Sequence, residues 1–231
     1  MDKKTPVVLS LGGSLVVPTG GIDTKYIEEF NTFIREKVAD GWRFFIEVGG
    51  GFTARHYIEA ARKISGGISD WDLDWLGIHT TRLNAHLIRT IFRDIAHPRV
   101  LHNLTKKITT LTQPVVVAAG WKPGCSTDYD AVVIARDYGA KMLINMSNIT
   151  TVFDKDPNKH TDAKPLHKLS WAEYSHLVGD KWEPGKNVPF DPVATKLAKE
   201  LGLRVYVVGK GLINFAKILA GDDFMGTVIA P

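Results

Sequence analysis

The sequence predicts an α/β fold in which parallel strands alternate with helices. Short apolar runs recur along the chain, as expected for strands that are buried on both faces. Several of these runs end in glycine, and segments with apolar residues at helical spacing follow them. Parallel strands joined by helical crossovers bind ligands at the carboxyl ends of the strands. The glycines therefore fall where a binding site is expected.

The first half of the chain repeats the order strand, glycines, helix. The first strand ends at Gly12-Gly13-Ser14, and the second ends at Gly49-Gly50-Gly51. The helix after the second strand carries Tyr57, Ile58, Ala61 and Ile64 on one face, as an amphipathic helix does. The predicted elements are a strand over 7–11, a helix from about 24 to 38, a strand over 44–48, a helix over 53–64 and a helix over 75–92.

The second half follows the same order. A loop over 120–128 contains glycine and separates a strand from a helix, as in the first half. Residues 147–168 are too rich in Asp, Asn, Lys and Pro to belong to the core. The predicted elements are a strand over 115–119, a helix over 129–138, a strand over 142–146, a helix from 191 to near 202, a strand over 205–208 and a helix over 212–219.

Length and composition predict one soluble domain with two lobes. The chain has 231 residues, of which 44% are hydrophobic and 23% charged, and no apolar run approaches the roughly 20 residues of a membrane helix. The first apolar run is too short for a secretory signal, and the lone Cys125 fits a reducing compartment, so a cytoplasmic location is expected.

Charge and metal-ligand patterns exclude other classes of function. The net charge of +4 is modest and no block of five like charges occurs, so neither nucleic-acid nor membrane binding is expected. The eight histidines show no metal-ligand spacing, and one cysteine cannot form a cluster, so no transition-metal site is expected.

The glycine turns indicate phosphate binding. Glycine at a strand end leaves backbone N–H groups free to approach an anion, and a helix N-terminus favours negative charge. One such turn is often purely conformational, whereas three favour phosphate. Neither the phosphate-loop spacing nor the dinucleotide fingerprint is present, so a nucleotide would be held in another way.

Seven ordered segments resemble the uridylate kinases of the amino acid kinase superfamily, and most closely the archaeal-type branch. The resemblance covers nearly the whole chain. It implies a three-layer αβα sandwich with a mostly parallel central sheet, the amino acid kinase fold. It also implies one domain over 1–231, whose lobe over about 1–110 binds the monophosphate acceptor and whose lobe over about 111–231 binds ATP. The segments are 11–14, 48–57, 73–85, 123–128, 152–157, 191–196 and 226–229.

The resemblance also implies residues for the acceptor, UMP. Gly50, Gly51 and Arg55 would hold its phosphate, because backbone N–H groups and a guanidinium suit a phosphate monoester. Asp74 would accept the ribose hydroxyls, with Asp70 and Asp72 close enough to be confused with it. Ser126 and Thr127 would contact the monophosphate and the base. The alternatives are a solvated arginine and a helix-capping acid.

The same resemblance implies residues for ATP and for the transfer. Asp128 and Asp191 would organise the transfer site, although both begin predicted helices and capping is an alternative. Lys196 is the candidate cation for the migrating phosphoryl group, and Mg²⁺ is expected with ATP. The ATP residues would be Gly12, Gly13 and Ser14 at the phosphates, and Ser147, Asn148, Phe153 and Asp156 near the nucleoside.

Two positions depart from the family pattern. Many superfamily members have lysine two residues before the first glycine, where this chain has Ser10. The usual Asp-Gly before the Val-Tyr or Val-Phe pair is Thr150-Thr151 here, which argues against the common tight turn. A loop at Trp182–Gly185 is expected to border the active site.

The predicted reaction is ATP plus UMP giving ADP plus UDP by direct transfer. An isopentenyl phosphate kinase is a rival, disfavoured because that family has histidine in the second glycine loop, where this chain has Phe52-Thr53-Ala54-Arg55. A nucleotide-binding or storage protein without transfer activity is the second rival, which Ser10 and Thr150-Thr151 keep open. The family forms hexamers, so a homohexamer is expected. Preference for UMP over CMP or dUMP, and any effector, do not follow from the sequence.

Overall fold

The computed structural model describes residues 3, 5–157, 159–179 and 188–231. A seven-stranded sheet runs in the order β3-β2-β1-β4-β8-β9-β7. Its described neighbours pair in parallel except for β8 and β9, which are antiparallel. The predicted, mostly parallel sheet is therefore confirmed. The strands are β1 (Val7–Leu11), β2 (Phe44–Val48), β3 (Val115–Ala119), β4 (Met142–Met146), β7 (Lys168–Ser170), β8 (Arg204–Val208) and β9 (Thr227–Ala230), with β5 (Val152–Phe153) and β6 (Pro165–Leu166) in a separate pair.

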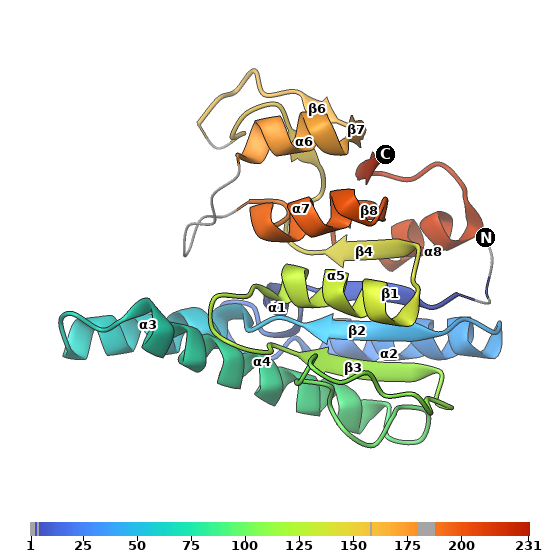
Figure 1. Ribbon diagram of the computed structural model, residues 1–231, viewed down its shortest axis with the longest axis horizontal. Coiled ribbons are helices and arrows are strands. Elements are labelled where there is room, and N and C mark those ends of the chain that lie inside the picture. Colours follow the sequence, from blue (N-terminus) through green and yellow to red (C-terminus); the bar gives the residue numbers. More distant parts are fainter. Residues whose placement is uncertain (1–2, 4, 158, 180–187) are drawn as a thin grey trace.

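Helices cover both faces of the sheet and complete the three layers (Figure 1). Apolar residues of α2, α4 and α8 share one buried cluster with the strands, and residues of α5, α6 and α7 share another. The predicted αβα sandwich is thus confirmed. The helices are α1 (Gly13–Val16), α2 (Thr24–Ala39), α3 (Gly51–Ile64), α4 (Asp70–Ile91), α5 (Thr127–Tyr138), α6 (Trp171–Val178), α7 (Pro192–Glu200) and α8 (Leu212–Ala220).

Alternation along β1 divides its residues between the two layers. Val7, Leu9 and Leu11 face the α2, α4 and α8 layer, whereas Val8 faces the α5 layer. Successive strand residues point to opposite faces, so Ser10 also faces α5. The sheet register places it beside Glu47 of β2 and Asn145 of β4. Three polar side chains thus lie on the α5 side near the carboxyl ends of the strands.

Some helices begin earlier than the apolar periodicity predicts, because polar caps determine the start. Helix α4 begins at Asp70 rather than at residue 75, since the Ser69 side chain accepts a hydrogen bond from the Asp72 N–H. Helix α6 was not predicted, although Ser170 and Glu173 form a capping box at its start. The short strands β5 and β6 lie within the stretch predicted to be outside the core, and Val152 of β5 is buried.

Helix α3 and the start of α4 project beyond the end of the sheet toward which β2 and β4 point (Figure 1). The predicted apolar face of α3 is not buried within the chain, because no described residue of this helix is buried. Tyr57 is 57% exposed and Ile64 is 85% exposed. Helix α3 packs against α4 and α1, beyond the edge of the core, and leaves these two apolar side chains exposed.

Candidate active site

The first two glycine turns touch each other at the carboxyl ends of β1 and β2. The Gly49 N–H donates to the Leu11 carbonyl at 3.0 Å. A Cβ atom built on Gly13 would lie 2.1 Å from the Gly51 nitrogen, and Gly51 has φ +65°. Neither position can accept a side chain without movement of the backbone. The two turns therefore form one continuous surface of main-chain atoms.

The buried Asn84 of α4 fixes the second glycine turn. Its Nδ2 donates to the carbonyl oxygens of Gly49 at 2.9 Å and Gly50 at 3.1 Å. These two hydrogen bonds fix the carbonyl groups of the turn. The turn leads directly into α3, whose first N–H groups lie at the same end of the sheet. No role was predicted for Asn84, although a polar residue between the apolar positions of a helix was a usable signal.

Helix α4 also holds the third glycine loop. The Gly120 N–H donates to Thr81 Oγ1 at 2.9 Å, and Arg82 donates to the Trp121 carbonyl at 3.0 Å. The Gly124 N–H donates to Asp74 Oδ2 at 2.8 Å. Among the three neighbouring acids, Asp74 therefore faces this loop. It does not cap the helix, because Ser69 does so.

Asp128 lies at the centre of a hydrogen-bond network that joins three elements. Its Oδ1 accepts from Ser10 Oγ at 3.1 Å and from Asn145 Nδ2 at 3.4 Å, and its Oδ2 accepts from the Asp191 N–H at 3.2 Å. Burial, together with the nearby Asp191 carboxylate, raises the pKa of Asp128 to about 7. Ser10, at the position of the family lysine, thus supplies a neutral hydroxyl to this acid.

Asp191 combines a capping role with a place in the network. Its Oδ1 accepts from the Ala194 N–H at 2.7 Å, which caps α7, and the residue is 4% exposed. Burial raises its pKa above the usual value. The loop before it is held by Asn145, which donates to the Pro189 carbonyl at 3.0 Å, and by Tyr174, which donates to the Phe190 carbonyl at 2.9 Å.

Other predicted residues border this region. The Ser126 side chain caps α5 by accepting from the Tyr129 N–H at 3.1 Å, and Thr127 is half-buried in the first turn of that helix. The Gly12 N–H donates to the Met146 carbonyl at 2.7 Å, so the first glycine turn lies against Ser147. Ser14 is half-buried in α1, and Asn148 is exposed.

The predicted cations lie on exposed helix surfaces. Arg55 of α3 and Lys196 of α7 are both exposed, and neither forms an ion pair with the residues that the structure describes. Phe153 lies in β5 and Asp156 follows it, where Asp156 pairs with Lys159 at 3.8 Å. The Trp182–Gly185 loop lies outside the described residues. The roles of these residues stay predictions.

Thr151 takes part in a hydrogen-bond arrangement that replaces a tight turn. Its hydroxyl lies 2.9 Å from Thr227 Oγ1, which also accepts from the Val152 N–H at 2.8 Å and donates to the Leu166 carbonyl at 2.6 Å. Thr227 is fully buried. Thr150 packs against Gly209, where an added Cβ would be 2.9 Å from its Cγ2. The two threonines thus join β5 to β9 and β8 through side chains.

Within the described part of the chain, no group of three His, Cys, Asp or Glu side chains could hold a metal ion.

Main-chain turns at three strand ends, linked to buried carboxyl groups, define an α/β protein built to receive phosphorylated ligands. Residues 5–209 match the amino acid kinase family, and the chain belongs to that family.

Several similar proteins are named uridylate kinase. The uridylate kinase of Methanocorpusculum labreanum is 34% identical, and the alignment covers 97% of this chain and 95% of the relative. That of Sulfurisphaera tokodaii is 35% identical over 90% of this chain and 94% of the relative. The crystal structure of uridylate kinase from Archaeoglobus fulgidus superimposes with a TM-score of 0.83 at 34% identity, covering 98% of this chain and all of the other. UMP kinase from Bacillus anthracis, at 20% identity and a TM-score of 0.74, shares the fold.

Proposed function

We propose that this chain is a uridylate kinase, which transfers the γ-phosphoryl group of ATP to UMP and serves pyrimidine nucleotide synthesis. The observation that carries the proposal is similarity over almost the full chain to uridylate kinases, including one solved structure at 34% identity. The joined glycine turns support it, because two phosphorylated substrates must meet end to end at one surface.

Phosphoryl transfer requires alignment and neutralisation of charge rather than a protein nucleophile. Gly12, Gly13 and Ser14 would orient the ATP phosphates, and Gly50 and Gly51 the UMP phosphate. Since Gly13 and Gly51 are in contact, the two phosphate sites would be adjacent. Asn84 would hold the acceptor turn rigid. MgATP supplies the divalent cation that screens the phosphate charges.

Arg55, Asp74, Ser126 and Thr127 would complete the acceptor site. Arg55 has no ion-pair partner among the described residues, so its guanidinium is available to a phosphate monoester. The Asp74 carboxylate already accepts one backbone hydrogen bond and retains further acceptor positions for ribose hydroxyls. Ser147, Asn148, Phe153 and Asp156 are proposed for the ATP nucleoside, with Asp128, Asp191 and Lys196 at the transfer site.

Two observations keep a nucleotide-binding protein without transfer activity as a second candidate. Ser10 brings no charge to Asp128, and Lys196 is exposed rather than paired with that acid. Such a protein would bind UMP without turnover. An isopentenyl phosphate kinase would instead release ADP when isopentenyl phosphate is the acceptor.

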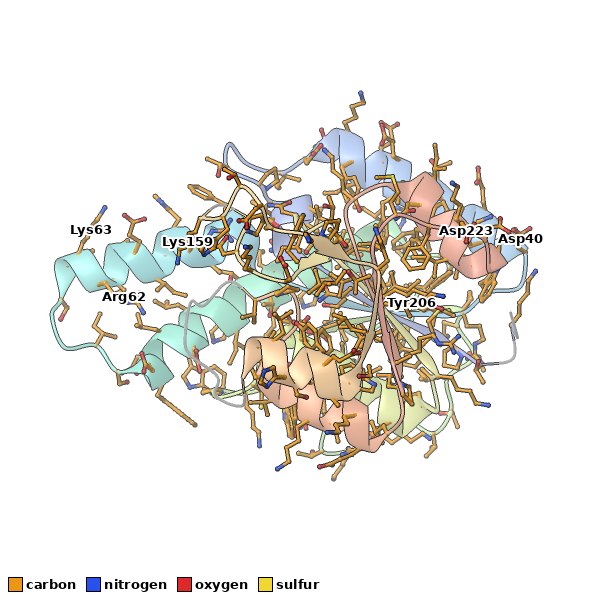
Figure 2. All side chains as sticks on the ribbon, turned by 90° about the horizontal axis from the view of Figure 1, so that it is seen from above. Asp40, Arg62, Lys63, Lys159, Tyr206 and Asp223 are labelled. Carbon is orange, nitrogen blue, oxygen red and sulfur yellow. The ribbon has the colours of Figure 1, made fainter. Side chains whose placement is uncertain are left out.

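The test is an assay of ADP release with MgATP and one acceptor at a time: UMP, CMP, dUMP or isopentenyl phosphate. The proposal expects turnover with UMP and a large rise in the KM for UMP in Arg55→Ala. Arg62→Ala is the matched control, because Arg62 lies on the same helix at the tip of the projection (Figure 2). Tight UMP binding without ADP release would support the storage protein instead, and turnover with isopentenyl phosphate alone would support the other kinase.

A homohexamer is proposed as the assembly. Tyr57, Ile64 and Trp71, on α3 and the start of α4, are each more than half exposed, and such apolar surface favours a contact between subunits. Light scattering of the intact protein tests the assembly. A cytoplasmic location is proposed from the single cysteine. No helix within the described residues has the length and apolar character needed to cross a bilayer.

A further inference from the structure

Glu47 is a completely buried acid without a visible partner. It lies on β2, the strand next to the edge strand β3, between Ser10 of β1 and Ala118 of β3, and it is 0% exposed. Neither carboxyl oxygen forms a hydrogen bond with any described residue. An ionised carboxylate in such a place would be strongly unfavourable unless a cation or several donors compensated it.

The groups around Glu47 are mostly acidic or neutral. Burial raises the pKa of Glu47 well above its usual value. The negative charges of Asp130 and Asp128, in the first turn of α5, raise it further. Ser10 and Asn145 face the same side of the sheet and donate to Asp128. Each of these donors is uncharged.

Asp130 is a second fully buried acid with an unpaired carboxyl oxygen among the described residues. It is 0% exposed, its Oδ2 accepts from the Trp121 N–H at 2.9 Å, and its Oδ1 has no described partner. Burial raises the pKa of Asp130 to about 7, while Lys122 and Arg82 lower it. From α7, Asp191 adds a further negative group next to Asp128. The carboxyl groups of Glu47, Asp128 and Asp130 therefore lie near one another, and the cations act on Asp130 rather than on Glu47.

We propose that Glu47 is a positioning residue that keeps its proton in the native protein and so limits the negative charge beneath Asp128. Three ionised carboxylates in this space would repel one another and the incoming phosphates. With Glu47 neutral, Asp128 keeps its bonds to Ser10 and Asn145 without a second charge behind it. The site thus reduces its negative charge by protonation, where Ser10 supplies no positive charge.

The first test is infrared spectroscopy of the full-length protein at neutral pH, in water and in deuterated water. A protonated carboxyl group has a carbonyl band distinct from that of a carboxylate, and the band shifts on deuteration. We expect this band in the native protein, its loss or reduction in Glu47→Gln, and its full retention in Glu36→Gln, which changes an exposed acid on α2. Identical spectra for all three proteins would overturn the proposal. If Glu47→Gln does not fold, absence of the band from the native spectrum would still overturn the proposal, and a band that persists above pH 8, where Asp128 and Asp130 are ionised, would support it.

The second test rests on the proposed kinase activity and is separate from the first, which needs no turnover. Glu47→Gln replaces a neutral acid by a neutral amide of similar shape, so we expect the pH profile of kcat/KM to match that of the native protein and its value to stay within about threefold. If Glu47 is ionised in the native protein, the variant removes a negative charge near Asp128 and the acidic limb moves to lower pH, which would contradict the proposal. Inactivity of the native protein with every acceptor would refute the proposed function and leave the infrared result standing.

Discussion

Replacement of Asn84 by alanine should loosen the acceptor turn and weaken the protein. The native amide makes two hydrogen bonds, to the carbonyl oxygens of Gly49 and Gly50, and the side chain is 4% exposed. Each lost bond costs about 1 kcal/mol, and a buried carbonyl left without a donor adds to that. We expect the free energy of unfolding to fall by about 2–4 kcal/mol. For a chain of this length that corresponds to roughly 5–15 °C in Tm.

The matched control is Asn214→Ala. Asn214 also makes two hydrogen bonds with the main chain, both to Met225, but they are exposed to water. Its loss should cost less than about 1 kcal/mol, since water replaces the missing partner. Urea unfolding measures both variants, and steady-state kinetics should show a larger rise in the KM for UMP than for ATP in Asn84→Ala. Equal destabilisation in the two variants, or an unchanged KM for UMP, would refute the assigned role of Asn84.

Three further predictions concern the glycines, Thr227 and pH. Gly13→Ala should lower the free energy of unfolding by about 3 kcal/mol or more, because its Cβ would overlap the backbone of Gly51. Gly66→Ala should be nearly neutral, because nothing lies within 4 Å of its added Cβ. Thermal unfolding that fails to separate the two variants would contradict this. Thr227→Val should lower the free energy of unfolding by about 2–3 kcal/mol, because it leaves buried polar groups without partners. Thr227→Ser keeps the hydroxyl and should lose much less in urea unfolding. Equal losses in the two variants would exclude the hydroxyl as the cause. Burial raises the pKa of Asp130 from 3.8 to about 7, so its contribution to stability is fully present below about pH 4 and is lost as pH rises to 7. Over this range the free energy of unfolding in urea should fall less steeply with pH in Asp130→Asn than in the native protein. Identical slopes would contradict the raised pKa.

The order of strands and helices along the chain was predictable because both depend on local patterns. Strands over 44–48 and 142–146 have the predicted bounds, since buried parallel strands are continuous apolar runs. The capping residues of α4 and α6 are equally local signals, and reading them in place of apolar spacing would have located both helix starts.

What the sequence did not reveal depends on contacts between distant segments. The reason that Gly13 and Gly51 must be glycine is the approach of two turns that are far apart in the sequence. The exposure of Tyr57 and Ile64 could not be predicted, because an amphipathic helix can bury its face within the chain or in an assembly. Glu47 lies in an apolar run, so its relation to Asp130 becomes visible only when α5 is packed on β2.

The central claim is tested most directly by identifying the product. ATP labelled at the γ-phosphoryl group is incubated with Mg²⁺, UMP and the purified full-length protein, and the nucleotides are separated. The account predicts labelled UDP, formed in an amount equal to the ADP released and reduced sharply in Arg55→Ala but not in Arg62→Ala. Unlabelled UMP recovered intact alongside tight UMP binding would contradict the account and identify a nucleotide-binding protein on a kinase fold.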